Sequence, residues 1–316
     1  MPHLFLFKMN YSVILPVFNE QENLESLYKR VVKVLTGLKE EYEIIFVNDG
    51  SLDRTGDILM ELNKKNNKVK IINFSRNFGH QIAVSAGLNF ATGDKVAILD
   101  ADLQDPPEIL PKFFSRLDEG YDVVYAVRKK RKENIFKIIS YSVFYKILRL
   151  IANIDIPLDS GDFCVLSRRM VKTINSFPER NRFVRGLRSW AGFKQIGLEY
   201  EREKRFAGTS KYGIRKLFKL AFDGIFSFSF VPLQIMFILG STSLFLSIIG
   251  IFWAIYMKFF TTAYARVPGF ATTTILIMFV GGLQLFSIGI MGEYLRRVYD
   301  EVKQRPQYII ESKVGF

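Results

Sequence analysis

Two carboxylates separated by one residue follow an apolar run in the N-terminal half of the chain. Asp100 and Asp102 come directly after residues 95–99 (KVAIL), a run of strand length. Mg²⁺ and Mn²⁺ prefer oxygen ligands, usually one or two carboxylates completed by water and phosphate oxygens. An isolated Asp-x-Asp more often forms a turn or a helix cap, but its place after a buried strand favours a metal site. The side chains of Asp100 and Asp102 need not point the same way. The turn that contains them can still bring one carboxylate to the metal and the other to a ligand.

Polar groups follow other apolar runs in the same way. Asp49 and Ser51 come after the run EIIFV, and Glu20 comes after YSVILPV. Asp49 either closes an Asx turn or accepts a hydrogen bond from a nucleobase. Arg128 opens the basic run RKKRK, which either supplies cations for a polyphosphate or is a solvated surface segment.

The elements that must position these groups alternate between strands and helices. Asn19 is expected to cap the first helix, and Pro107 suits a helix start. Unbroken apolar runs are typical of strands buried on both faces, so the alternation predicts an α/β fold with a largely parallel sheet and helices on both sides. Ligands bind beyond the carboxyl ends of such strands, where the polar groups lie. Strands are expected at 11–17, 43–47, 69–74, 95–99 and 122–127, and helices at 21–35, 53–66 and 81–91.

Two long segments near the C-terminus contain no charged residue. Residues 233–257 and 268–292 are each 25 residues long, enough to cross a bilayer with some tilt. Two buried core helices are the alternative. The short connection, 258–267, predicts a helical hairpin. Lys and Arg are more abundant outside the hairpin than in its loop, so both chain ends are expected on the cytoplasmic side. Glycines in the second segment permit close helix contact and hence a homo-oligomer.

The composition sets further limits. The net charge is +13 and 49% of residues are hydrophobic, a combination that suits a protein on an anionic membrane surface better than one that binds nucleic acid. The lone Cys164 excludes an internal disulfide and a thiolate metal cluster. Apolar residues 4–7 are too few for a signal peptide, so the N-terminal part is expected in the cytoplasm.

An amphipathic helix is expected at 214–228, just before the first long apolar segment. At 100° per residue, Arg215, Lys216, Lys219 and Asp223 share one arc and apolar residues occupy the rest. This pattern predicts an interfacial helix with its apolar side at the acyl boundary. A helix packed on the sheet is the alternative.

Several motifs together carry a family resemblance. They are residues 13–20 (VILPVFNE), 47–55 (VNDGSLDRT), 75–81 (SRNFGHQ), 99–107 (LDADLQDPP) and 205–212 (RFAGTSKY). In this order they resemble family-2 glycosyltransferases, most closely the polyprenyl-phosphate branch that includes bactoprenol glucosyltransferase and dolichyl-phosphate mannosyltransferase. The resemblance implies a GT-A fold, inversion at the anomeric carbon and a metal-bound nucleoside diphosphate leaving group. It also implies membrane contact by residues 134–151.

The resemblance assigns roles to particular residues. Asp100 matches the donor-side carboxylate, and Asp102 and Gln104 match ligands of Mg²⁺ or Mn²⁺. The expected nucleotide-sugar site comprises Pro16, Val17, Glu20, Asp49, Ser51 and Asp100. Residues 185–190 (RGLRSW) are only loosely similar to the Gln-x-x-Arg-Trp motif of processive polysaccharide synthases. The absence of the full motif counts against a processive synthase.

A lipid phosphate acceptor is largely a dianion at neutral pH and scarcely needs a general base, so cations must position it. The expected catalytic set is Asp159, Asp162, Asp100 and Arg128, and Arg128, Arg131, Arg205 and Lys211 are expected to bind the lipid phosphate. Asp159 is favoured over Asp162 at the base position, and a turn centred on Gly161 is the alternative. His80 is expected to be a loop or capping residue, and residues 180–188 to be structural or on the surface.

We therefore expect an integral membrane glycosyltransferase that moves glucose from UDP-glucose to polyprenyl (undecaprenyl) phosphate. UDP-linked amino sugars or GDP-mannose as donor, a hydroxyl lipid as acceptor, and a non-enzymatic scaffold or translocation partner remain alternatives. The expected divisions are a catalytic domain (1–210), an interfacial helix (211–230), two transmembrane helices (231–294) and a cytoplasmic tail (295–316).

Overall fold

The structure is a computed structural model that describes residues 9–128, 160–180, 182–201, 229, 231–260 and 270–316. It forms two compact units. The first unit contains the described residues up to 201 together with the C-terminal segment Arg305–Phe316, and the second contains two long helices. Each unit is described on its own.

The first unit is built on an 8-stranded sheet in the order β7-β5-β6-β4-β1-β2-β3-β8. Strands β4, β1, β2 and β3 are parallel, which confirms the expected parallel core, whereas β6 and β8 run antiparallel to their neighbours, so the whole sheet is mixed. The strands are β1 (Tyr11–Val17), β2 (Tyr42–Asn48), β3 (Val69–Phe74), β4 (Lys95–Ile98), β5 (Val123–Arg128), β6 (Ser160–Ser167), β7 (Gln195–Tyr200) and β8 (Ile310–Val314).

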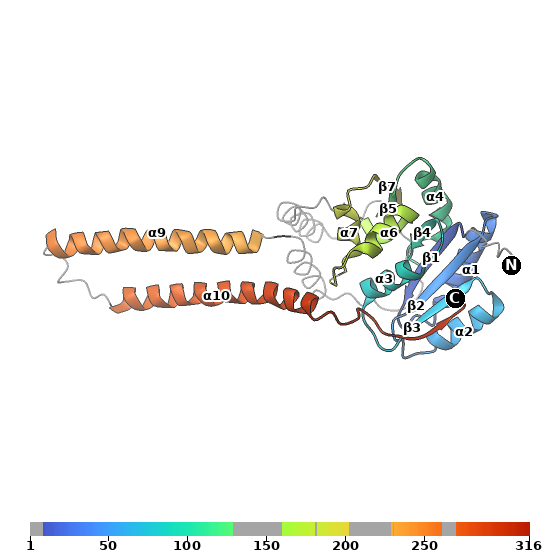
Figure 1. The fold of residues 1–316 in the computed structure, drawn as a ribbon, viewed down its shortest axis with the longest axis horizontal. Helices are drawn as coiled ribbons and strands as arrows, with labels where there is room; N and C mark the ends of the chain where they lie inside the picture. Colours follow the sequence, from blue (N-terminus) through green and yellow to red (C-terminus); the bar gives the residue numbers. More distant parts are fainter. Residues whose placement is uncertain (1–8, 129–159, 181, 202–228, 230, 261–269) are drawn as a thin grey trace, which may run out of the picture. The chain divides into compact units, whose positions relative to one another are not determined.

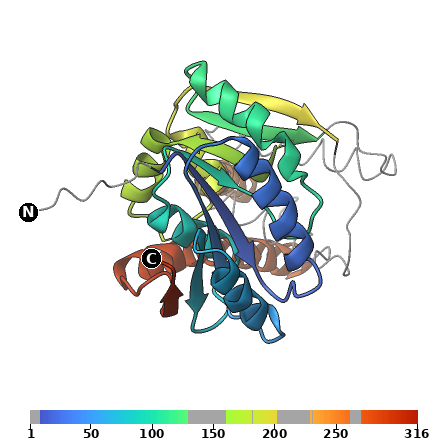
Figure 2. The same ribbon diagram turned by 90° about the vertical axis from the view of Figure 1, so that its right-hand side faces the viewer.

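Helices cover both faces of this sheet (Figures 1 and 2). Successive strand residues alternate between two hydrophobic clusters, as the two-residue period of a strand requires. In β1, Val13 and Leu15 pack with α1, α2 and α4, whereas Ile14 packs with α3, α6 and α7. The helices are α1 (Leu24–Gly37), α2 (Thr55–Lys65), α3 (His80–Phe90), the 3₁₀ turn η1 (Pro107–Ile109), α4 (Leu110–Asp118), α6 (Arg168–Ser176) and α7 (Val184–Trp190).

The elements expected in the N-terminal half are present, with boundaries shifted by a few residues. One expected detail is wrong, because Asn19 does not cap the first helix. Helix α1 begins at Leu24, and Asn19 adopts a left-handed φ of 53° in the preceding loop. Its side-chain Oδ1 accepts a hydrogen bond from the Leu52 amide at 2.8 Å, so it joins two loops instead.

The C-terminal segment Arg305–Phe316 returns to the sheet of the first unit. Strand β8 pairs antiparallel with β3 at one edge, and the Tyr308 ring stacks on Phe74 at a centroid distance of 5.0 Å. The sequence pattern had placed 295–316 in a tail. In the structure the helix that precedes this segment continues to Val302, and residues 310–314 complete the sheet.

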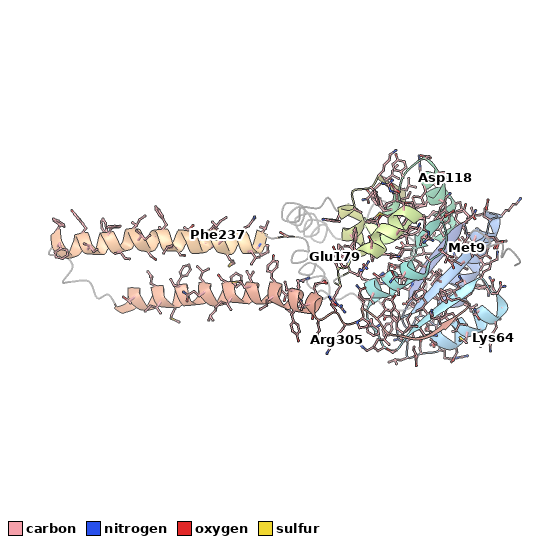
Figure 3. The ribbon with its side chains drawn as sticks, in the orientation of Figure 1. Met9, Lys64, Asp118, Glu179, Phe237 and Arg305 are labelled. Carbon is pink, nitrogen blue, oxygen red and sulfur yellow. The ribbon has the colours of Figure 1, made fainter. Side chains whose placement is uncertain are left out.

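The second unit contains α9 (Val231–Phe260) and α10 (Phe270–Val302). By length and composition, Val231–Trp253 and Leu276–Val302 are candidate membrane spans, with mean hydropathies of 2.2 and 1.6. Their apolar side chains project outward along both helices (Figure 3), and Phe237 is 76% exposed. A helix that is apolar on all sides and not covered by protein suits a lipid environment. The expected membrane-contacting segments 134–151 and 214–228 lie outside the described residues.

Two helical glycines provide a matched test of the packing between α3 and β1. A Cβ added at Gly87 would overlap Cγ2 of the fully buried Ile14, whereas one added at Gly37 in α1 meets nothing within 4 Å. We expect Gly87→Ala to lower the free energy of unfolding by about 1–3 kcal/mol, as overpacking does. Gly37→Ala should be neutral or raise it by up to about 1 kcal/mol, because alanine favours the helix.

Urea denaturation followed by Trp190 fluorescence measures both changes, in a Trp253→Phe background so that only the first unit is reported. Equal free energies of unfolding for the two variants would contradict the close packing of α3 against β1 described here.

Candidate active site

The candidate site lies beyond the carboxyl ends of β1, β2 and β4. Strand β1 pairs with β2 on one side and with β4 on the other. The strand order therefore reverses at β1, because the chain leads from β1 to β2 in one direction along the sheet and from β4 to β5 in the other. In open α/β sheets, a crevice for ligands forms at such a switch point. Asp49 follows β2, and Asp100 and Asp102 follow β4.

In the segment after β4, buried and partly exposed residues alternate. Ala101, Leu103 and Asp105 are buried, whereas Asp100, Asp102 and Gln104 are partly exposed. Asp100, Asp102 and Gln104 are therefore the partly exposed residues of this segment.

Local contacts hold this segment in its shape. Leu103 has a left-handed φ of 58°, which costs about 1–3 kcal/mol for a residue with a side chain and persists only where the surroundings enforce it. Asp102 Oδ1 accepts a hydrogen bond from the Gln104 amide at 3.1 Å. The Tyr200 hydroxyl of β7 donates to the buried Asp105, which anchors the segment from the other side.

Asp49 is a buried carboxylate held by backbone amides. The Phe78 and Gly79 amides donate to its two oxygens at 2.7 and 2.9 Å. Burial raises the pKa of Asp49, although these two amides oppose the shift. A carboxylate has about four lone-pair sites, so two acceptor sites remain for a ligand such as a nucleobase. Gly50, with a φ of 67°, lies so close to the Arg76 backbone that a side chain there would clash.

Ser51 and Glu20 connect the loops that follow β1 and β2. Ser51 Oγ accepts a hydrogen bond from the Asn19 amide at 3.0 Å, and the Glu20 amide donates to Thr55 Oγ1 at 3.0 Å. The Glu20 carboxylate accepts a hydrogen bond from Asn23 at 2.6 Å. Pro16 and Val17, at the end of β1, are buried. The expected nucleoside-binding residues therefore come together on two joined loops.

Asp162, on β6, is held from two helices. Arg185 of α7 donates to Asp162 Oδ1 from Nε at 3.3 Å and from Nη2 at 3.1 Å. Gln81 of α3 donates to Asp162 Oδ2 at 3.2 Å and accepts from the Val184 amide at 3.1 Å. Burial disfavours the charged carboxylate, but Arg185 and His80 outweigh it and hold the pKa of Asp162 well below its usual range. Arg185 therefore contacts a carboxylate of the candidate site, within a segment (180–188) that was expected to be structural or on the surface.

His80 lies between two carboxylates. It is the first residue of α3, and its Nε2 is 3.5 Å from Asp100 Oδ1 and 3.5 Å from Asp162 Oδ2. These are ion-pair distances, longer than good hydrogen bonds. Burial opposes the charged imidazole, but attraction to Asp162 and Asp100 raises the pKa of His80 to about 9. Sequence reasoning missed this role because neither partner is near His80 in the chain, although His80 and Gln81 stand in the motif SRNFGHQ.

The charges around Asp100 are suited to a divalent cation. Burial raises the pKa of Asp100 to about 6; His80 opposes this, and the carboxylates of Asp162, Asp105 and Asp102 add to it. Asp100 Oδ1 is buried and has no hydrogen-bond partner within the described part of the chain. Among those same residues, no three acidic, histidine or cysteine side chains already form a metal-binding group. Mg²⁺ and Mn²⁺ commonly take one or two carboxylates and complete the shell with water and phosphate, so the residues fit such an ion.

The structure thus brings Asp100, Asp102 and Asp162 together, with Asp49 at the end of a nearby strand. Arg128 is the last residue of β5, a strand that pairs with β6, which carries Asp162. The other expected residues, Asp159, Arg131, Arg205 and Lys211, lie outside the described residues.

Comparison with known proteins identifies the family. Residues 12–174 match the model of glycosyl transferase family 2, and this range contains β1 to β6 and the carboxylates described above. This chain is a family 2 glycosyltransferase. Its fold is accordingly the mixed α/β arrangement of the GT-A type.

Relatives of this glycosyltransferase match it over nearly the whole chain. It is 43% identical to the uncharacterized glycosyltransferase YkcC of Bacillus subtilis, over 97% of this chain and 95% of that protein. It is 40% identical to the SfII prophage-derived bactoprenol glucosyl transferase of Shigella flexneri, over 96% of this chain and 98% of that protein. Both matches extend through the two apolar helices.

Among solved structures, the glycosyltransferase is similar to glucosyl-3-phosphoglycerate synthase from Mycobacterium tuberculosis in complex with Mn²⁺ and UDP-glucose. The sequence identity is 18% and the TM-score is 0.44, over 67% of this chain and 75% of that chain.

The charge of His80 can be measured directly. Because its folded-state pKa is raised, we expect its imidazole to keep its proton at neutral pH and to lose it near pH 9. Asp162→Asn removes one attracting charge and leaves Arg185 to repel the imidazolium, so the midpoint should fall toward the ordinary value of about 6.5. NMR of the histidine-labelled protein follows the titration, and His80→Gln identifies the signal. A wild-type midpoint near 6.5 would contradict the ion pairs described here.

Proposed function

We propose that this glycosyltransferase moves glucose from UDP-glucose onto a polyprenyl phosphate such as undecaprenyl phosphate, and so forms a lipid-linked monosaccharide. The observation that carries the proposal is the 40% identity to a bactoprenol glucosyl transferase over 96% of the chain. Two features of the structure support it: a carboxylate-rich site for a nucleotide-sugar and two helices apolar enough to anchor the enzyme beside a lipid acceptor.

The donor would bind at the loops after β1, β2 and β4. Pro16, Val17, Glu20 and Ser51 would surround the nucleoside, and Asp49 would accept a hydrogen bond from the base through its remaining lone pairs. Asp100 would face the sugar. Asp102 and Gln104, which are both partly exposed, would hold Mg²⁺ or Mn²⁺. The bound ion would neutralise charge on the diphosphate as it leaves.

The acceptor chemistry needs no strong base. With a second pKa near 6, a phosphate monoester is largely a dianion at neutral pH. A phosphate oxygen would bond to the anomeric carbon while the bond from that carbon to the diphosphate oxygen breaks and UDP departs with the electron pair. Asp162 accepts hydrogen bonds on both oxygens and is poorly suited to take a proton, so we assign it to positioning. Asp159 remains the alternative residue at this position.

Cations would hold the acceptor against the anionic donor. Arg128 ends the strand beside β6, and Arg131, Arg205 and Lys211 complete the proposed lipid-phosphate site. Without them, repulsion between the diphosphate and the lipid phosphate would oppose the approach that the reaction needs.

The membrane arrangement is also part of the proposal. Strand β8 follows α10 and pairs with β3, so the chain rejoins the catalytic sheet after the two apolar helices. This supports a helical hairpin with both ends on one side. The distribution of Lys and Arg makes that side cytoplasmic. Contacts between helices of different copies would allow a homo-oligomer within the membrane.

A transfer assay tests the function. The purified full-length chain in lipid nanodiscs is incubated with Mn²⁺ and undecaprenyl phosphate, and with radiolabelled UDP-glucose, UDP-N-acetylglucosamine or GDP-mannose in turn. We expect label from UDP-glucose to enter the organic phase. Replacing undecaprenyl phosphate by diacylglycerol should prevent transfer, because a hydroxyl acceptor requires a base. Asp102→Ala should lower turnover by at least about 100-fold.

Asp57→Ala is the matched control, since it removes an exposed carboxylate from α2 of the same unit and should retain activity. Preferential labelling from another donor would correct the sugar. Transfer to diacylglycerol but not to the phosphate would refute the acceptor, and full activity of Asp102→Ala would refute the metal assignment.

A further inference from the structure

Asp100 lies two residues beyond the end of β4, and Asp162 lies on the neighbouring strand β6. Strands β4 and β6 are antiparallel, and Ile98 is the register partner of Cys164. Continuing this register by two residues places Asp100 opposite Asp162. Like charges directly across a strand pair are destabilising, so two carboxylates at this position require a compensating group.

His80 is the group that lies between them. Its Nε2 is equidistant from the two carboxylates, at 3.5 Å from each, and has no hydrogen-bond partner within the part of the chain that the structure describes. A neutral imidazole gains little at this distance because a hydrogen bond needs a closer approach. A positive charge is attracted to both carboxylates in a partly buried site. The position of His80 between two carboxylates therefore favours the charged imidazole over the neutral one.

Charged groups face His80 from each surrounding element. The N-terminus of α3 is itself electropositive and disfavours a cation at its first residue, so the attraction must come from the carboxylates. Arg185 also opposes the charge, whereas the carboxylates outweigh both effects. Asp162 and Asp100 attract the charge on His80, Arg185 repels it, and Asp49 after β2 also interacts with it. Asp102 and Asp105 after β4 act on Asp100.

We propose that His80 is a positioning residue whose positive charge holds Asp100, assigned to the donor, beside Asp162, assigned to the acceptor, and that turnover depends on this charge. The inference rests on the proposed transfer between two anionic substrates. Such a site must keep its own carboxylates together before a diphosphate and a phosphate add further negative charge. Gln81 supports the arrangement, because it ties Asp162 to the amide of Val184 at the start of α7.

Kinetics of two variants separate charge from shape. His80→Gln keeps a polar side chain at the start of α3 but removes the charge, so kcat should fall by about 100-fold, the usual effect of losing one fixed electrostatic group. The KM for UDP-glucose should change less than kcat, because most of the residues assigned to the nucleoside lie at the end of β1 and in the loops after β1 and β2. His80→Lys retains a positive charge and should keep at least about tenfold more of kcat than His80→Gln. Lys112→Gln, which removes one positive charge from the exposed side of α4, should behave as wild type.

The pH profile gives a second readout that does not depend on folding of the Gln variant. In the wild type, kcat should decline as the pH passes about 9, where His80 loses its proton. In His80→Lys this decline should move to higher pH. Because a lysine titrates above a histidine, an unchanged profile would show that His80 does not act through its charge.

The outcomes distinguish this inference from the proposed function. If the wild type transfers no sugar to undecaprenyl phosphate, the proposed function fails. If the wild type is active, but His80→Gln has wild-type kcat or the Gln and Lys variants are equally impaired, the function stands and the role of His80 is refuted.

Discussion

Carboxylates crowded at the ends of two paired strands repel one another, and the arrangement of this site follows from the need to compensate that repulsion. Asp100 and Asp102 follow β4, and Asp162 lies on the adjacent β6. Arg185 and Gln81 occupy both oxygens of Asp162, and His80 attracts Asp162 and Asp100 together. Burial and the neighbouring carboxylates raise the pKa of Asp100 to about 6, and the proposed divalent cation would relieve this repulsion. The same excess of negative charge explains why cations are needed for a phosphate acceptor.

The scaffold holds these carboxylates close together because helices pack on both faces of its sheet. Each strand of the parallel core supplies alternate residues to two hydrophobic clusters, and helices from both sides fix the positions of the strand ends. Helix α3 does more than cover the sheet, since its first two residues, His80 and Gln81, contact the carboxylate of Asp162. At the opposite edge, β8 ties the segment after α10 to the sheet. The catalytic sheet and the apolar helices are thus connected through a strand as well as through the chain that precedes α9.

The parallel core was predictable from the sequence because strands buried on both faces appear as unbroken apolar runs. The same logic located Asp49, Asp100 and Asp102, since each directly follows such a run. Strands β6, β7 and β8 were not predicted, because their pairing depends on distant segments: β8 meets β3 across most of the chain. The positions of His80 and Arg185 were missed for the same reason, as each meets Asp162 only when the chain folds. Asn19 had the residue type of a helix cap, but its contact with the loop after β2 determined its conformation.

The central claim is that the carboxylates of the segment after β4 bind a divalent cation. Diffraction at the manganese edge from crystals of the full-length protein grown with Mn²⁺ and UDP tests this claim most directly. The account predicts one strong anomalous peak within about 2.0–2.3 Å of an Asp102 carboxylate oxygen, also in contact with the diphosphate and absent in Asp102→Asn. Manganese bound away from the Asp100–Gln104 segment, or UDP bound at the same place and equally tightly without any metal, would contradict it.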